Sequence, residues 1–199
     1  MHYQASTDQQ LSEFVYKTKI AGLYFVKHKS FSDERGFYSE IARVNEIEAL
    51  TNEKFVVQQM GHSRSQTNVL RGFHAEDWNK LATLASGKIL SIIVDIRPDS
   101  PTFAQYEQFV LGFDSESLQG ALYISRGLAN GFAVLEGPAD YIYMVDALYS
   151  QRDKSKDKAI ALFDPDLKIN WPIAQEKMIF SKRDKNSVTL RELFPQNFL

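Results

Sequence analysis

Short apolar runs with a strand-like pattern recur along the chain and are separated by turn residues. The runs lie at 22–29, 54–64, 80–85, 88–97, 106–112, 120–127, 132–136, 140–149 and 158–163. Turn signals between them include Ser86-Gly87, Pro98-Asp99 and Gly137-Pro138. Many short, evenly spaced strands are typical of a β-barrel or a β-sandwich. The pattern therefore predicts an all-β fold with few helices.

Residues outside these runs have weaker patterns. Residues 44–53 are predicted to form a short helix, and residues 8–17 to form either a second helix or an N-terminal arm. No internal repeat or low-complexity tract divides the chain. We therefore predict one domain, with an N-terminal arm or helix over 1–20, a β-barrel or sandwich over 21–165 and a C-terminal wrapping segment over 166–199.

Composition and charge exclude several classes of protein. The 199 residues are 44% hydrophobic and 24% charged, which is ordinary for a soluble globular domain. A net charge of −2 gives no basic field for nucleic acid, and no apolar run approaches the roughly 20 residues of a membrane span. The absence of cysteine excludes disulfides, thiolate metal sites and a cysteine nucleophile. The first residues lack a signal-peptide pattern, so we expect a cytoplasmic protein without nucleic acid or membrane partners.

The segment 68–80, NVLRGFHAEDWNK, concentrates the candidate chemistry. His74 is a candidate general base because an imidazole titrates near neutral pH, although a structural histidine is the alternative. Arg71 and Lys80 favour an anionic substrate or a developing oxyanion. In a regular strand His74 and Arg71 would face opposite sides, whereas a bulge at Gly72 would break that alternation.

A metal centre is an alternative use of the same histidine. Many small β-barrel enzymes hold a metal with two histidines one residue apart and a carboxylate. Here Ala75 and Glu76 follow His74, and His62 lies twelve residues upstream. Zinc and iron sites need three or four good ligands, so we expect no protein-bound metal.

Two further segments carry candidate residues. In the aromatic run 140–149, Tyr143 shares one strand face with Tyr141 and is either a general acid or a core aromatic. In the run 31–40, Arg35 lies at a glycine turn that leads into a strand and is a candidate for phosphate binding. The chain has neither a Walker lysine motif nor a GxGxxG loop.

Several motifs, taken in order, carry a resemblance to a known family. They are Asp33-Glu34-Arg35-Gly36 with Glu40, Val69-Leu70-Arg71-Gly72-Phe73-His74, Lys80, VDIRPDSPTF (94–103), ISRGLANGF (124–132), Tyr143 with Tyr149, DPDLKINWP (164–172) and SKRD (181–184). The set resembles the dTDP-4-dehydrorhamnose 3,5-epimerases over nearly the whole chain. The resemblance implies a cupin-type jelly-roll, a homodimer that exchanges N-terminal strands, and an isomerase without a metal or organic cofactor.

The resemblance also implies roles for individual residues. The catalytic set would be His74 as base, Asp184 as its orienting carboxylate, Lys80 as the partner of the enolate oxygen, and Tyr143 as the acid on the opposite face. The substrate-binding set would be Arg35, Tyr38, Glu40, Gln59, Arg71, Asn130, Tyr149 and Arg183. A C–H beside a ketone is a weak acid, so its removal needs a placed base and a stabilised enolate.

Three departures from the family pattern leave the substrate open. Asn130 stands where the family usually has histidine, Gly61 stands where it has asparagine, and the segment 74–80 is shorter and carries Trp78. The expected activity is inversion of C3, C5 or both in a dTDP-, CDP- or GDP-linked 4-keto-6-deoxyhexose, for deoxysugar and surface polysaccharide biosynthesis. The alternatives are a single-carbon epimerase, a 3,4-ketoisomerase, a metal-dependent cupin and a non-catalytic sugar-nucleotide-binding cupin.

Overall fold

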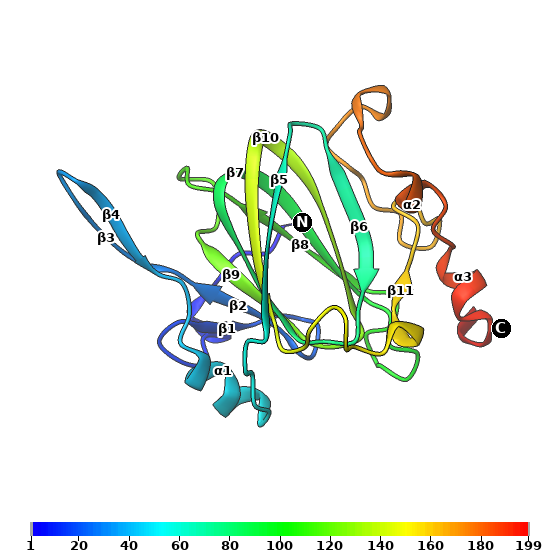
Figure 1. Cartoon of the computed structure of the whole chain (residues 1–199), viewed down its shortest axis with the longest axis horizontal. Coiled ribbons are helices and arrows are strands. Elements are labelled where there is room, and N and C mark those ends of the chain that lie inside the picture. Colours follow the sequence, from blue (N-terminus) through cyan, green and yellow to red (C-terminus); the bar gives the residue numbers. More distant parts are fainter. Residues whose placement is uncertain (1, 199) are drawn as a thin grey trace.

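The structure is a computed structural model that describes residues 2–198, and one large antiparallel sheet dominates it (Figure 1). Its strands are β1 (Val15–Lys17), β2 (Leu23–Lys27), β5 (Gln59–Ser65), β6 (Leu70–Ala75), β7 (Lys80–Asp95), β8 (Tyr106–Leu111), β9 (Gly120–Ile124), β10 (Leu128–Val145) and β11 (Lys158–Ala159). They are hydrogen-bonded in the order β1-β2-β9-β7-β10-β6-β11, with β5 paired to β10 and β8 paired to β7. The all-β prediction is confirmed.

Helices are short and peripheral. The α-helices are α1 (Val44–Thr51), α2 (Lys182–Lys185) and α3 (Leu190–Leu193), and the 3-10 turns are Thr7–Gln9, Lys154–Lys156, Gln175–Lys177 and Pro195–Phe198. The helix predicted over 44–53 is confirmed as α1. A helix over 8–17, one of two alternatives for that segment, is wrong, because the segment contains only the end of a 3-10 turn and then β1.

The two longest strands correct another prediction. The runs 80–85 and 88–97 fall largely within the single strand β7, and the runs 132–136 and 140–149 fall largely within the single strand β10. The expected turns are instead irregularities, since the pairing of β10 with β7 shifts register between Val134 and Glu136 and again between Glu136 and Tyr141. Gly and Pro at these points therefore bend long strands rather than end them.

A hairpin projects from the body of the molecule. The strands β3 (Lys29–Asp33) and β4 (Gly36–Glu40) pair only with each other and form a separate two-stranded sheet. The hairpin extends well beyond the other strands in Figure 1. Its aromatic side chains Phe31, Phe37 and Tyr38 are more than half exposed. The sequence pattern predicted only a turn and one strand in this region.

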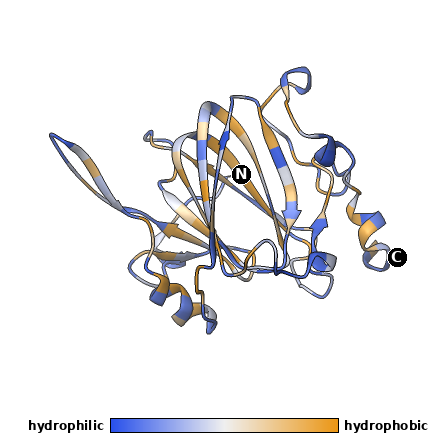
Figure 2. Cartoon of the chain, in the orientation of Figure 1, coloured by the Kyte–Doolittle hydropathy of each residue, from blue (hydrophilic) through white to orange (hydrophobic). Residues whose placement is uncertain are grey.

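Clusters of buried apolar residues hold the main sheet and the C-terminal segment together. One cluster of buried residues includes Phe25, Phe109 and Tyr141, and a second joins Phe73 of β6 to Trp171 of the C-terminal segment. The Phe73 and Trp171 rings stack with centroids 5.8 Å apart. Figure 2 shows many hydrophobic positions along the strands of the main sheet, whereas α2 is hydrophilic. The C-terminal segment thus covers the outer side of β6.

Candidate active site

A cavity of about 390 Å³ opens beside β5, β6 and β10. It is lined by Gln59, Ser63, Arg71, Gly72, His74, Glu76, Trp78, Lys80, Asn130, Phe132, Tyr141, Tyr143, Tyr149, Ser181, Arg183 and Asp184. The volume lies in the usual range for small-molecule sites. All four residues of the expected catalytic set line this one cavity, although they come from four different parts of the chain.

A bulge at Gly72 brings Arg71 and His74 to the same cavity. Across the β6–β10 pair, His74 lies opposite Asn130 and Arg71 lies opposite Phe132. The strand β6 therefore contains one more residue between these two pairs than β10 does. Gly72 has a φ of 125°. A Cβ atom there would lie 2.5 Å from the Cα of Gly131, so only glycine fits this close approach of two strands. Of the two arrangements considered for this strand, the bulged one is confirmed.

His74 forms a dyad with a buried carboxylate. The His74 Nε2 lies 2.7 Å from the Asp184 Oδ1, and Asp184 is only 6% exposed. The other oxygen of Asp184 accepts a hydrogen bond of 2.8 Å from the Ser181 hydroxyl, which also caps α2 by accepting from the Asp184 backbone N–H. The carboxylate is therefore fixed from both sides, and it orients the imidazole.

A second acid–base pair lies beside the dyad. The Lys80 Nζ lies 3.2 Å from the Glu76 Oε2, and both side chains are largely buried. Burial alone would raise the pKa of Glu76, but the charges of Lys80, His74 and Arg152 outweigh it and lower that pKa. Glu76 is therefore ionised and holds the Lys80 ammonium at the cavity wall.

Tyr143 occupies its position because Gly61 leaves room for its ring. The two residues lie opposite each other in the β5–β10 pair. A Cβ atom at Gly61 would lie 2.5 Å from the Tyr143 ring. The Lys80 Nζ lies 5.6 Å from the centroid of the same ring. Any larger residue at position 61 would therefore require the Tyr143 ring to move.

An aromatic and cationic cluster lies beside the cavity. The Arg152 guanidinium lies over both Trp78 and Tyr149, at 4.5 and 4.1 Å from the ring centroids, and it is bound by Asp157. The backbone N–H of Tyr149 donates a 2.8 Å hydrogen bond to the Gln59 side chain. Gln59 therefore supports the Tyr149 loop here.

Three residues of the expected substrate-binding set lie away from this cavity. Arg35, Tyr38 and Glu40 are on the projecting β3–β4 hairpin. The exposed Arg35 is paired with Asp33, its Nη2 lying 2.5 Å from the Asp33 Oδ2, and Glu40 is paired with Arg43. Within one chain, the structure does not bring them to His74.

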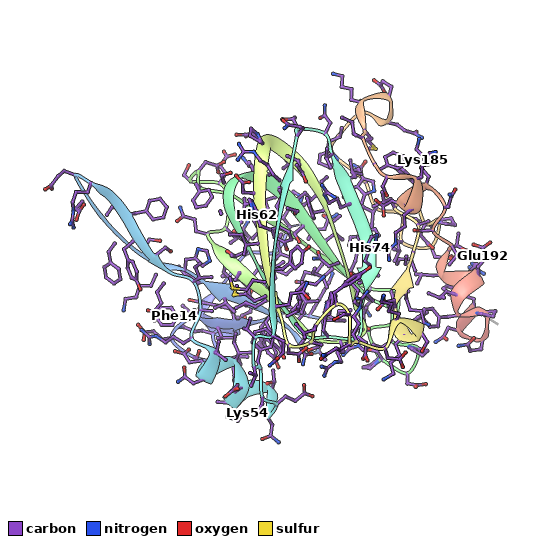
Figure 3. All side chains as sticks on the ribbon, viewed as in Figure 1. Phe14, Lys54, His62, His74, Lys185 and Glu192 are labelled. Carbon is purple, nitrogen blue, oxygen red and sulfur yellow. The ribbon has the colours of Figure 1, made fainter. Side chains whose placement is uncertain are left out.

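The two histidines weighed for a metal site do not meet. His62 points to the other side of β5, where its Nε2 lies 2.8 Å from Asp140, and it does not line the cavity. Figure 3 shows His62 and His74 on different strands. Among residues 2–198, no group of three or more metal-ligating side chains is found. No helix in the same range has the length and apolarity to span a bilayer.

Sequence reasoning missed several lining residues. Glu76 was considered only as a metal ligand, and Tyr141 only as a neighbour of Tyr143. Trp78 was noted only as a difference from the family's sequence pattern. Ser181 and the supporting residue Arg152 were not singled out. The alternation in 140–149 could have indicated Tyr141, since residues two apart share a strand face. No local signal indicated Arg152, whose role depends on tertiary contacts.

Together, the sheet and its cavity define a candidate enzyme site whose side chains are suited to acid–base chemistry. The sequence model of the family described as dTDP-4-dehydrorhamnose 3,5-epimerase matches residues 17–192. The chain therefore belongs to the dTDP-4-dehydrorhamnose 3,5-epimerase family, whose activity is that of an isomerase. The family prediction made from the motifs is confirmed.

Individual relatives agree with this assignment. The dTDP-4-dehydrorhamnose 3,5-epimerase of Salmonella typhimurium is 34% identical over 165 residues, covering 81% of this chain and 87% of the relative. A solved epimerase from Legionella pneumophila in complex with dTDP-4-keto-L-rhamnose has a TM-score of 0.80 and 31% identity, covering 92% of this chain and 95% of that one. A 3'-monoepimerase from Streptomyces bikiniensis in complex with dTDP-quinovose has a TM-score of 0.79 and 28% identity, with 91% and 93% coverage. These likenesses confirm the cupin-type jelly-roll prediction.

Proposed function

We propose that this enzyme inverts one or both ring carbons beside the ketone of a nucleotide-linked 4-keto-6-deoxyhexose. The observation that carries the proposal is the His74–Asp184 dyad, which shares one cavity with Lys80 and Tyr143. Relatives whose names specify a 4-keto sugar or its product support the substrate class.

The proposed first step is removal of a proton from the carbon beside the ketone. Because Nε2 of His74 contacts Asp184, the Nδ1 atom is left with the free lone pair that accepts this proton. Asp184 then stabilises the imidazolium. The electron pair of the broken C–H bond moves to the ketone oxygen, and the Lys80 ammonium stabilises the resulting enolate.

The second step returns a proton to the other face of the same carbon. Tyr143 is the proposed donor, because its ring is held at the cavity wall between Gly61 and Lys80. The enolate collapses to the ketone as the new C–H bond forms, after which solvent returns a proton to Tyr143 and takes up the proton held by His74. One proton leaves and one enters, so the reaction needs no oxidant or cofactor.

We propose that the nucleotide portion lies toward the mouth of the cavity. Arg71 and Arg183 line the cavity and would pair with the diphosphate, and the half-exposed Tyr149 would lie against the nucleobase. The Arg71 Nε donates a 3.0 Å hydrogen bond to Ser65, which orients its guanidinium. Binding energy from this non-reacting portion would position the sugar ring at His74.

We propose a homodimer in which each β3–β4 hairpin reaches the cavity of the other subunit. The exposed aromatic residues on the hairpin support this, because isolated two-stranded hairpins are rarely stable without a surface to cover them. In this arrangement Arg35, Tyr38 and Glu40 of one subunit would contact the substrate in the cavity of the other, which agrees with the substrate-binding roles that the family resemblance implies. A cytoplasmic location stays a prediction.

Subunit mixing tests the hairpin exchange. Chains carrying His74→Ala and Arg35→Ala would be inactive alone, but a mixed dimer would hold one intact cavity and one intact hairpin at the same site. Co-expression should therefore restore about a quarter of the wild-type activity if subunits pair randomly. A mixture that stays inactive, although mass measurement confirms mixed dimers, would contradict exchange.

Single-carbon inversion is the second candidate. Its support is the likeness to a 3'-monoepimerase, together with the substitutions at positions 61 and 130 that border the catalytic groups. The same assay separates the candidates. The enzyme is mixed in D2O with dTDP-, CDP- or GDP-4-keto-6-deoxyglucose and a 4-ketoreductase, and the product is examined by NMR.

Deuterium at C3 and C5 would support double inversion, and deuterium at one carbon would identify a single-carbon enzyme. A 3-keto product would instead indicate a ketoisomerase. No incorporation with any of the three nucleotides, from folded protein, would contradict the proposed function and favour a binding role.

A further inference from the structure

Arg152 is a buried cation that lies beside the cavity without lining it. It belongs to the connection between β10 and β11, and its side chain is only 3% exposed. Asp157 accepts hydrogen bonds from the Arg152 Nε, at 3.1 Å, and from its Nη2. The Nη1 atom donates a hydrogen bond of 2.9 Å to the Tyr149 carbonyl. A buried charge is destabilising unless it is paired, and here all three guanidinium nitrogens have partners that fix the group in one orientation.

The fixed guanidinium contacts two aromatic side chains that do line the cavity. It lies 4.5 Å from the ring centroid of Trp78 and 4.1 Å from that of Tyr149. The two ring centroids are 6.5 Å apart. Trp78 is on the connection between β6 and β7, so one cation joins two segments that are far apart in the sequence. Contacts of a cation with aromatic rings are strongest where the cation is desolvated, as Arg152 is.

The position of Trp78 is linked to the Glu76–Lys80 pair. The backbone N–H of Trp78 donates a hydrogen bond of 2.8 Å to the Glu76 carbonyl, so both residues belong to one turn. The Glu76 carboxylate in turn lies 3.2 Å from the Lys80 Nζ. Burial raises the pKa of Glu76, whereas the charges of Lys80, His74 and Arg152 lower it. Arg152 therefore acts on Glu76 both through this turn and through its charge.

A second ion pair joins the same two connections on their exposed side. The Lys156 Nζ lies 3.3 Å from the Asp77 Oδ2, and the Lys156 side chain is 62% exposed. Neither residue lines the cavity. Exposed ion pairs contribute little to stability, so this pair is not expected to fix the turn. Lys156 therefore provides a matched control for Arg152.

We propose that Arg152 is a positioning residue for both substrate binding and catalysis. It holds the rings of Trp78 and Tyr149 as the wall against which the nucleotide lies. It also keeps Glu76 in place, and with it the Lys80 ammonium. This inference rests on the proposed function, in which Tyr149 lies against the nucleobase. Trp78 is in the connection that is shorter here than in the family pattern, so this role adds to the set of residues that the motifs identify.

Steady-state kinetics of two variants test both parts of the role. Arg152→Met removes the charge and the hydrogen bonds, so KM should rise about tenfold and kcat should fall about fivefold. Arg152→Lys returns a positive charge near Glu76 but not the flat guanidinium, so KM should still rise about fivefold while kcat stays near that of the wild type. In the control Lys156→Met, both constants should stay within about twofold of the wild type.

Nucleotide binding gives a second readout that needs no turnover. Calorimetry with dTDP, CDP and GDP identifies the nucleotide that the wild type binds most tightly, and its Kd should rise about tenfold in Arg152→Met but not in Lys156→Met. Tryptophan fluorescence follows the same titrations. The chain has two tryptophans and Trp171 lies outside the cavity, so a change on binding reports Trp78. This change should be smaller in Arg152→Met, because the indole is no longer held in the wall.

Three results would overturn the inference. One is an Arg152→Met variant that melts at a lower temperature while its folded fraction keeps the KM, kcat and Kd of Lys156→Met, since Arg152 would then only stabilise the fold. If Arg152→Met does not fold, the second is an Arg152→Lys variant with wild-type KM and Kd. The third is a wild type that binds none of the three nucleotides. If the wild type binds a nucleotide but exchanges no deuterium in the sugar, the proposed function fails separately, and the Kd values alone decide on Arg152.

Discussion

Two buried carboxylates in this molecule, Asp184 and Asp95, are both held by hydrogen bonds but differ in their position relative to the cavity. Asp184 is bound by His74 and Ser181 and lines the cavity. Asp95 is fully buried away from the cavity. The difference between them lies in what their partners can still do, because the imidazole of His74 keeps one nitrogen free whereas the partners of Asp95 are all engaged in contacts that hold the fold.

The partners of Asp95 close the turn that follows β7. Its oxygens accept hydrogen bonds from Arg97, Ser100 and Thr102, at 2.6 to 2.8 Å for the side-chain contacts of Arg97 Nε, Arg97 Nη2 and the two hydroxyls. Arg97 also donates to the carbonyl of Ala21 and so ties this turn to the N-terminal segment. The VDIRPDSPTF motif therefore identifies the family through structure rather than chemistry.

The largest expected effect is a loss of kcat on substitution of Asp184, which would distinguish this carboxylate from Asp95. Asp184→Asn should lower kcat about a thousandfold, because the imidazolium loses its counter-charge and the imidazole its fixed orientation. The melting temperature of the variant should stay close to that of the wild type. Deuterium exchange at the carbon beside the ketone and a melting curve measure the two effects, and retained exchange in the folded variant would contradict a role for the dyad.

The converse effect is expected at the structural carboxylate. Asp95→Asn should lower the free energy of unfolding by about 2–3 kcal/mol, because Arg97 loses its charged partner and hydrogen bonds within the turn are lost. The folded fraction should keep kcat near that of the wild type. Urea unfolding and assays normalised to folded protein would measure this. A variant that is as stable as the wild type but has a much lower kcat would contradict a purely structural role for Asp95.

A smaller effect on activity is expected at Glu76. Glu76→Gln should lower kcat about tenfold with little change in KM, because Lys80 then loses its fixed position against the enolate oxygen. Glu136→Gln is the matched control, since the exposed Glu136 pairs loosely with Lys88 at 3.8 Å outside the cavity. If both variants keep the same kcat, the Glu76–Lys80 pair does not position Lys80 for the reaction.

The smallest expected effect is a difference in acid sensitivity. Burial would raise the pKa of Asp95, but hydrogen bonds from Arg97, Ser100 and Thr102 outweigh burial and lower it. A carboxylate with a lowered pKa in the folded state stabilises the fold above its ordinary pKa of about 4, and this contribution is lost as the pH falls further. Unfolding free energies measured from pH 7 down to about 3 should therefore converge for wild type and Asp95→Asn. A constant difference across this range would contradict the lowered pKa.

Sequence reasoning grouped the candidate site residues better than it predicted the limits of the strands. His74, Lys80, Tyr143 and Asp184 could be chosen because their motif order is specific, and the structure gathers them in one cavity. The continuity of β7 and β10 could not be predicted, because glycine and proline signal a turn and a bulge equally well.

Contacts between distant segments account for the other omissions. The position of Arg152 between Trp78 and Tyr149 depends on the path of the loop after β10. The polar environment of Tyr141 depends on the register between β7 and β10, which no local pattern specifies.

The long strand β10 has an evolutionary consequence. Asn130, Tyr141 and Tyr143 all lie on it, and it is paired along its length with β5, β6 and β7. Inserting or deleting one residue between them would turn one group out of the cavity, since side chains alternate along a strand. Variation among descendants of this chain should therefore occur by substitution in β10, whereas changes in length should accumulate in connections away from the cavity, such as residues 113–118 between β8 and β9.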